Sequence, residues 1–162
     1  MAATFSRCGR FRYRLERVLD PTGDRTVVWI MLNPSTADAN TDDQTIRRVR
    51  HFTASNFEDV HDVVVVNLYA FRATAPQNLS LAEDPQGPRN TWHVRRAFES
   101  ADEVVVGWGA SLQAWRHENP SRVLGVLRNR TLWCLGETSS GDPCHPLRIA
   151  SSRRMEHWTP RS

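Results

Sequence analysis

The chain contains no lysine, so all 21 of its basic residues are arginine. Against 18 acidic residues they leave a formal net charge of +3. A surplus this small permits nucleic-acid binding but does not require it. The arginine-only composition has two interpretations: a bias of the source genome, or a surface that binds phosphate oxygens through planar guanidinium groups.

Long apolar segments and metal-binding motifs are also missing. No segment has the roughly 18 consecutive apolar residues of a membrane span, and residues 1–9 lack the apolar stretch of a signal peptide. We therefore expect a cytoplasmic protein that does not contact membranes. The three cysteines, Cys8, Cys134 and Cys144, have neither the number nor the spacing of a disulfide framework. Because zinc normally takes four ligands, we expect no metal and no cofactor.

Two catalytic signatures are absent. No serine lies in a G-x-S-x-G elbow and no H-E-x-x-H occurs, which argues against acyl transfer by a nucleophile elbow and against zinc hydrolysis. The turn at 107–109 lacks the G-x-G-x-x-G spacing and a Walker lysine, so its glycines can simply allow a close backbone approach. The helix expected to follow offers an anion site at its start, and we retain as phosphate-contact candidates Trp108, Gly109 and Ser111.

With 162 residues, the chain is long enough for one domain with a real core, and we expect a single domain over 1–162 with flexible ends at 1–9 and 151–162. Apolar, β-rich runs occur at 26–32, 60–68, 103–107 and 131–135. Helical patterns occur at 41–52, 88–100, 111–117 and 120–127. This alternation predicts an α/β fold, a three-layer α/β/α sandwich around a mainly parallel four-stranded sheet.

Two local patterns add detail to this fold. The segment 11–19 alternates large and charged residues in part, which predicts an exposed N-terminal antiparallel strand. We expect it to form a hairpin with 26–32 across the turn at 20–24. Thr41 and Gln44 have the spacing of a capping box, with Thr41 at the N-cap of the first helix.

Polar residues follow the predicted strands at the edge where open α/β sheets bind ligands. Asn33 and Pro34 come directly after one strand, and Asn67 ends the next. Asparagine and proline are also common turn residues. However, an amide at the end of a buried strand must find partners, and it can both donate to and accept from a nucleobase edge. Ser35 and Thr36 place two hydroxyls beside Asn33 as candidate phosphate contacts.

Aromatic and basic residues lie near these amides. Tyr69 and Phe71 are either core residues or a platform on which a base stacks. Arg72 and Arg148 are candidate phosphate contacts. His145 is the histidine placed at the predicted strand-end edge, where an imidazole can act as an acid or stabilise a leaving anion.

Carboxylates allow a different chemistry. Asp38, Asp42, Asp43 and Asp84 could bind magnesium, although the second and third of these suit a helix start. A magnesium-dependent nucleotide hydrolase that uses Asp38 and Asp84 is therefore an alternative, and full activity in excess chelator would contradict it.

The stretch from about 11 to 149 resembles an uncharacterised family of small bacterial and phage proteins known only as a domain of unknown function. The motifs that carry this resemblance are Met31–Asp38, Asn67–Thr74, Asp84–Asn90 and His145–Leu147. Asn90 enters as a candidate site residue through the third of these motifs. The resemblance implies no activity.

The order of the motifs also resembles, more distantly, the uracil-DNA glycosylase superfamily. This resemblance implies that Asn33 positions a hydrolytic water, that Asn67 binds the base and that His145 steadies the departing base. Met31 and Ser35 stand where the first motif of that superfamily usually has glycines.

We therefore expect a nucleobase N-glycosylase that acts on DNA or a nucleotide, in a protein that is a monomer. A nucleobase-binding module without catalysis is the first alternative.

Overall fold

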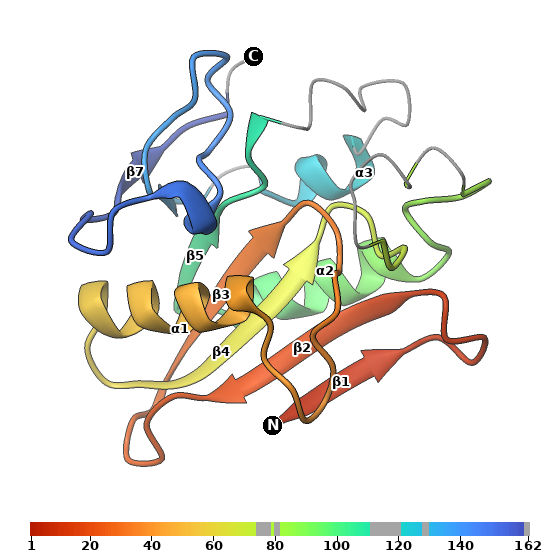
Figure 1. Cartoon of the computed structure of the whole chain (residues 1–162), viewed down its shortest axis with the longest axis horizontal. Coiled ribbons are helices and arrows are strands. Elements are labelled where there is room, and N and C mark those ends of the chain that lie inside the picture. The colour runs from red at the N-terminus through yellow and green to blue at the C-terminus, as the bar shows by residue number, and fades with distance from the viewer. Residues whose placement is uncertain (74–78, 80–81, 111–120, 128–129, 161–162) are drawn as a thin grey trace.

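The computed structural model describes residues 1–73, 79, 82–110, 121–127 and 130–160. In this part of the chain one seven-stranded sheet has the order β1-β2-β4-β3-β5-β6-β7 (Figure 1). The strands are β1 (Ala2–Phe5), β2 (Arg12–Val18), β3 (Arg25–Met31), β4 (Val60–Asn67), β5 (Glu103–Val106), β6 (Leu132–Cys134) and β7 (Glu156–Trp158). The helices are α1 (Gln44–Asn56), α2 (Asn90–Glu99) and α3 (Ser121–Leu124), with 3-10 turns η3 (Gly125–Leu127) and η4 (Pro146–Arg148).

The centre of the sheet is parallel, as the alternation of strands and helices predicts. β3 pairs in parallel with β4 on one side and with β5 on the other, and β5 pairs in parallel with β6. The expectation of a four-stranded sheet is wrong, because antiparallel strands extend both edges. β1 and β7 are the outermost strands of the sheet. They lie in the two end segments, 1–9 and 151–162, that the sequence suggested were flexible.

The expected hairpin between the segments 11–19 and 26–32 is also wrong. β2 pairs with β4 in the register Leu15↔Val65, so β4 lies between β2 and β3, and β2 forms its hairpin with β1. The turn at 20–24 reaches across the start of β4, where Asp20 N donates to Val60 O at 3.2 Å. β3 and β4 carry long buried runs, and a central position covers both of their edges.

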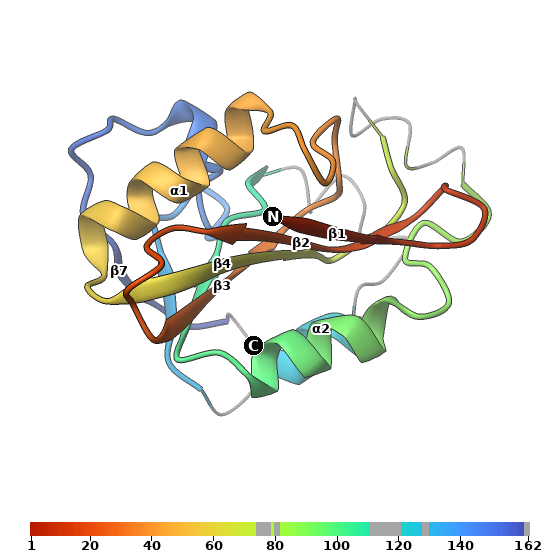
Figure 2. The ribbon, with the colours of Figure 1, turned by 90° about the horizontal axis from the view of Figure 1, so that it is seen from below.

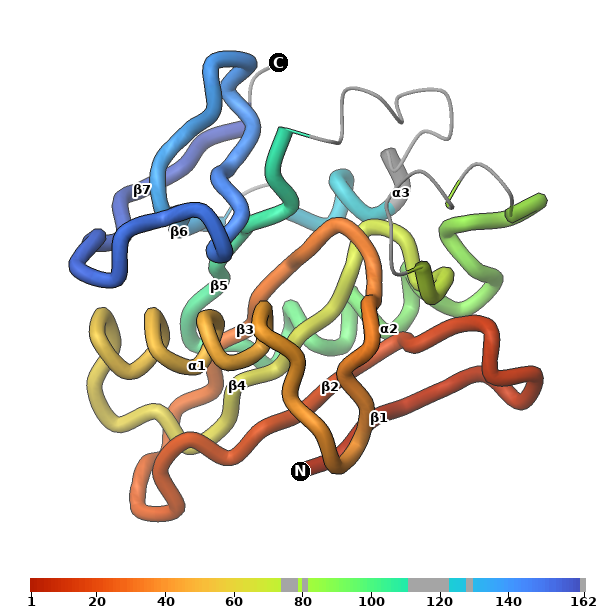
Figure 3. Tube along the Cα trace, in the orientation of Figure 1, coloured from red at the N-terminus to blue at the C-terminus, as the bar shows by residue number. Residues whose placement is uncertain are grey.

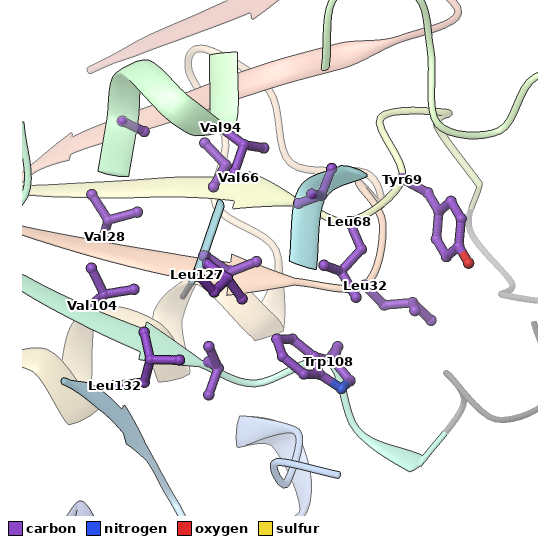
Figure 4. Packing of buried hydrophobic residues seen from close by; sticks show 14 of the residues in the cluster. Val28, Leu32, Val66, Leu68, Tyr69, Val94, Val104, Trp108, Leu127 and Leu132 are labelled. Carbon is purple, nitrogen blue, oxygen red and sulfur yellow. The ribbon is translucent and has the colours of Figure 1, made fainter. Parts of the chain in front are cut away.

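Alternation along the strands supplies an apolar layer on each face of the sheet. Val27 and Trp29 of β3 belong to the cluster that packs against α1, whereas Val28 belongs to the cluster that packs against α2. Figure 2 shows the sheet edge-on between α1 and α2, which is the expected three-layer arrangement. In Figure 4, Val94 of α2 lies beside Val66 of β4 within the cluster on the α2 side.

The first helix begins later than the capping box predicts. Its N-cap is Asp43, whose Oδ1 accepts a hydrogen bond from Ile46 N at 2.9 Å. Thr41 does not cap the helix because Asp38 closes a separate turn over it, accepting from Thr41 N at 2.9 Å. The helix expected at 111–117, with the candidate Ser111, lies outside the described residues. No helix in the described ranges is long and apolar enough to cross a membrane.

Candidate functional site

A cavity of about 470 Å³ lies at the carboxyl ends of the central parallel strands. Its lining comes from the ends of β3 and β4, the turn after β5, the first turn of α1 and the residues around η4. Figure 3 shows the segment around η4 next to α1, although the two are far apart in the sequence. The fold thereby brings together Asn33, Asn67 and His145, which all line this cavity.

Asn67 is the last residue of β4 and is only 1% exposed. Neither its amide nitrogen Nδ2 nor its oxygen Oδ1 has a hydrogen-bond partner among the described residues. A buried polar atom without a partner costs about 1–3 kcal/mol and is rare in native proteins. Since Asn67 lines the cavity, a ligand that accepts from Nδ2 and donates to Oδ1 would satisfy both atoms.

The side chain of Asn33 is oriented by its own amide group. Nδ2 donates to Pro34 O at 3.0 Å and to Ala73 O at 2.8 Å. Both bonds use amide hydrogens, so they fix the side chain and do not occupy the acceptor Oδ1. Pro34 is buried, and its carbonyl also accepts from Ala73 N at 3.0 Å. It is absent from the cavity lining, so it holds the loop that presents Asn33.

His145 caps η4 with its ring, because Nδ1 accepts a hydrogen bond from Leu147 N at 3.3 Å. This bond assigns the proton of the neutral ring to Nε2, which is then a donor. Burial lowers the pKa of His145 below its ordinary value, and the charge of Arg148 lowers it further, while Asp43 acts in the opposite direction. The imidazole is therefore neutral at pH 7.

The turn after β5 packs closely on His145. Gly109 has φ +77°, and a Cβ at this position would lie 3.1 Å from His145 Cβ. Gly109 N donates to Pro143 O at 2.8 Å, and Trp108 Nε1 donates to Asp142 Oδ1 at 3.5 Å. Trp108 and Gly109 both line the cavity. These contacts explain why residue 109 is a glycine: its backbone lies close to His145, and a side chain there would crowd that residue.

Arg48 of α1 holds the segment that carries His145. Its Nε donates to Pro146 O at 3.3 Å, its Nη1 donates to Ser151 Oγ at 2.6 Å, and its Nη2 donates to Ile149 O. One side chain thus binds the first residue of η4 and the chain that follows it. The candidate Arg148 lies within η4, is exposed and lines the cavity.

Asn90 supports the end of β4 from α2. The side chain is fully buried, and its Nδ2 donates to Asn67 O at 2.9 Å and to Leu68 O at 3.1 Å. Asn90 does not line the cavity. Its contribution is to fix the backbone from which Asn67 projects.

A second cavity, of about 320 Å³, adjoins the first and shares Ser35 and Ala73 with it. The candidates Thr36, Phe71 and Arg72 line this second cavity. Arg72 is exposed and lies 5.1 Å from the ring centroid of Phe5. The candidate phosphate contacts Ser35, Thr36 and Arg72 therefore line a cavity next to the one that Asn33, Asn67 and His145 line.

The remaining candidates lie away from both cavities. Tyr69 has no exposed surface and belongs to the core cluster on the α2 side, where Figure 4 shows its ring. Asp38 caps backbone N–H groups of its own turn, which lowers its pKa. Asp84 is exposed and accepts from Gly87 N at 3.0 Å. No cluster of three or more His, Cys, Asp or Glu side chains in the described ranges could hold a metal ion.

Sequence reasoning missed Arg12 as a charged residue of the first cavity, and it considered Asp43 only as a magnesium ligand or a helix-start residue. β2 was expected to be exposed, yet Arg12 and Arg17 are 2% and 1% exposed. The available signal was the acidic segment that ends in Asp42 and Asp43, since buried arginines need acidic or carbonyl partners. Asp42 is the partner of Arg17, at 2.6 Å.

The comparisons with known proteins concern the family alone. No curated protein and no solved structure matches the chain. A family model described as "Protein of unknown function (DUF1643)" matches residues 12–147, a range that contains all three strand-end polar residues of the first cavity. The chain therefore belongs to this family of proteins of unknown function, DUF1643.

Proposed function

We propose that the first cavity binds a nucleobase and that the protein hydrolyses the N-glycosidic bond of a nucleotide, free or within DNA. The observation that carries this proposal is Asn67: a buried amide with both a donor and an acceptor unpartnered, facing a cavity. Nucleobase edges present adjacent donors and acceptors that match an amide. A volume of about 470 Å³ also lies in the usual range for small-molecule sites.

The three strand-end side chains can contact the attacking water and the departing base of such a reaction. Asn33 Oδ1 can hold a water molecule, whose oxygen forms the new bond to C1′ of the sugar. The bond between C1′ and the base nitrogen breaks, and the base leaves with the electron pair. His145 Nε2–H can donate to the developing anion, and donors of this kind contribute roughly 3–4 kcal/mol. The water supplies a hydroxyl group to the sugar, and its proton neutralises the base.

The distant resemblance to the uracil-DNA glycosylase superfamily supports the same three roles. The motif containing Asn33 corresponds to the one that positions water there, Asn67 to the base-reading residue and His145 to the residue that steadies the leaving base. The convergence of these side chains on one cavity is what such a site requires.

The test is a panel of oligonucleotides and nucleotides that carry different modified bases, with released free base measured by mass spectrometry. Asn33→Ala and His145→Ala should each reduce release at least about 100-fold and leave the fold intact by circular dichroism. Matched controls are Asn40→Ala and His157→Ala, which change exposed residues outside this cavity. Wild-type release from both cavity variants would refute the proposal.

One observation favours a second candidate, a module that binds a nucleobase without turnover. Both amide hydrogens of Asn33 bond to the backbone, so holding the loop is by itself a sufficient role for this residue. Binding of a base-containing probe by the wild-type protein, with no free base released from any member of the panel, would identify this module.

A further inference from the structure

Arg12 is a buried cation that has no counter-ion among the residues that the structure describes. It is 2% exposed and lines the first cavity. Its Nη1 donates to Ala37 O at 2.6 Å, but its Nε has no partner, and it forms no ion pair with any described residue. Arg17 on the same strand is equally buried but bonds Asp42 and the carbonyls of Glu16 and Asp38.

A local irregularity of β2 turns Arg12 toward the cavity. The pairing with β1 shifts between Thr4, which is opposite Arg14, and Phe5, which is opposite Arg12, so Tyr13 is an extra residue. Leu15 packs in the cluster beneath α1, and residues three apart on a regular strand face opposite sides. The extra residue reverses this relation, as β-bulges do, and Arg12 therefore lies on the α1 side with Ala37.

Among the described residues, the charged groups around Arg12 include no carboxylate that forms an ion pair with it. Asp43 is the one carboxylate among the described residues that line this cavity, and its two oxygens accept from Ile46 N at 2.9 Å and Ala37 N at 3.4 Å. Burial lowers the pKa of Arg12 to about 10; Asp43 opposes this, and Arg72 and Arg17 add to it. Arg12 therefore stays protonated at neutral pH. A buried charge of this kind is costly unless a ligand supplies its partner.

We propose that Arg12 binds a phosphate oxygen of the ligand whose base Asn67 recognises, and that this contact selects a nucleotide over the corresponding nucleoside or free base. This inference rests on the proposed nucleobase site. The adjoining second cavity supports it, since Ser35, Thr36, Arg10 and Arg72 offer hydroxyl and guanidinium groups along which a sugar–phosphate could continue. A phosphate monoester of a free nucleotide and a phosphodiester of a strand share this chemistry.

The experiment compares dissociation constants for matched probes by isothermal titration calorimetry. The probes are the 5′-monophosphates of deoxyadenosine, deoxycytidine, deoxyguanosine, thymidine and deoxyuridine, the five nucleosides without phosphate, and inorganic phosphate. For each base that binds, the wild-type protein should bind the nucleotide at least about ten-fold more tightly than the nucleoside. In Arg12→Met this advantage should fall to within about two-fold, with the affinity for the nucleoside unchanged.

Controls separate a ligand contact from a structural role. Arg14→Met removes a partly exposed arginine of the same strand that pairs with Glu16 and does not line the cavity, so it should leave both affinities unchanged. Arg12→Lys should restore part of the nucleotide preference, because it restores the charge. Arg12→Met should not lower the melting temperature. Equal losses for nucleoside and nucleotide, or equal wild-type affinities for both, would overturn the assignment.

The probes also separate this inference from the proposed function. If inorganic phosphate binds the wild type but not Arg12→Met, while no nucleoside binds and the nucleotides bind no more tightly than inorganic phosphate, the anion site stands and the nucleobase site fails. If none of the probes, inorganic phosphate included, binds the wild type, the phosphate site is refuted, and the nucleobase site is then decided by the panel of modified bases. Competition by a single-stranded deoxyoligonucleotide identifies the phosphodiester as the source of the phosphate, and a lack of competition identifies the free nucleotide.

Discussion

Asn67 and Asn90 are two buried asparagines for which one substitution should have opposite effects. Asn67→Leu replaces an amide whose two polar atoms are unpartnered by an apolar group of similar shape. Asn90→Leu removes donors that bond the carbonyls of Asn67 and Leu68. We therefore expect the first variant to be more stable than the wild type without ligand, and the second to be less stable.

The magnitudes follow from the cost of unsatisfied buried groups. An unsatisfied atom costs about 1–3 kcal/mol, and Asn67 has two such atoms, so at the low end of this range its replacement should stabilise by about 2 kcal/mol. For a chain of this size that raises the melting temperature by about 4–8 °C. Asn90→Leu loses two hydrogen bonds to backbone carbonyls, so it should destabilise by about 2 kcal/mol despite its own unpartnered Oδ1.

The assay is thermal unfolding by circular dichroism, with denaturant titration to obtain the free energy of unfolding. In the same samples, Asn67→Leu should lose binding of base-containing probes, which would show that the buried amide serves ligand recognition at the expense of stability. A melting temperature of Asn67→Leu below that of the wild type would refute this reasoning, because it would mean that the amide atoms stabilise the ligand-free fold.

Three further predictions concern stability and pH. Arg17→Met should destabilise by about 3 kcal/mol, because it breaks a buried ion pair with Asp42 and three bonds to carbonyls; an unchanged denaturation midpoint would contradict this. Gly109→Ala should lower the melting temperature and reduce base release, since Gly109 has a positive φ and the new methyl would press on His145; wild-type kinetics would argue against this packing. Burial lowers the pKa values of His145 and His93 in the fold, so the neutral rings contribute stability that is present above pH 6.5, their unfolded value, and is lost as the pH falls through the lower folded values. The melting temperature should therefore fall between about pH 6.5 and 5, before carboxylates titrate, and the fall should be smaller in His145→Gln; an equal fall in that variant would show that His145 is not responsible.

Much of the site could be anticipated because its residues follow apolar strands. Asn33 and Asn67 end runs that must be buried, and parallel strands bring such ends to one edge. His145 follows β6 by a longer loop, yet it reaches the same cavity. Tyr69 could not be placed in this way, because an aromatic residue after a strand can face either the core or a ligand, and here it lies in the core.

The sequence by itself determined the parallel centre of the sheet, the helical pattern that becomes α1 and the three strand-end polar residues. Each of these depends on periodicity or on the residues that directly follow a strand, and both are local signals. Only the tertiary structure decided that β2 pairs with β4, that Tyr13 is an extra residue and that Arg12 enters the cavity. Strand neighbours and bulges depend on pairing between distant segments, and one extra residue moves a side chain from one face of a sheet to the other. The position of the Arg12 charge in the cavity is therefore set by long-range pairing of β2.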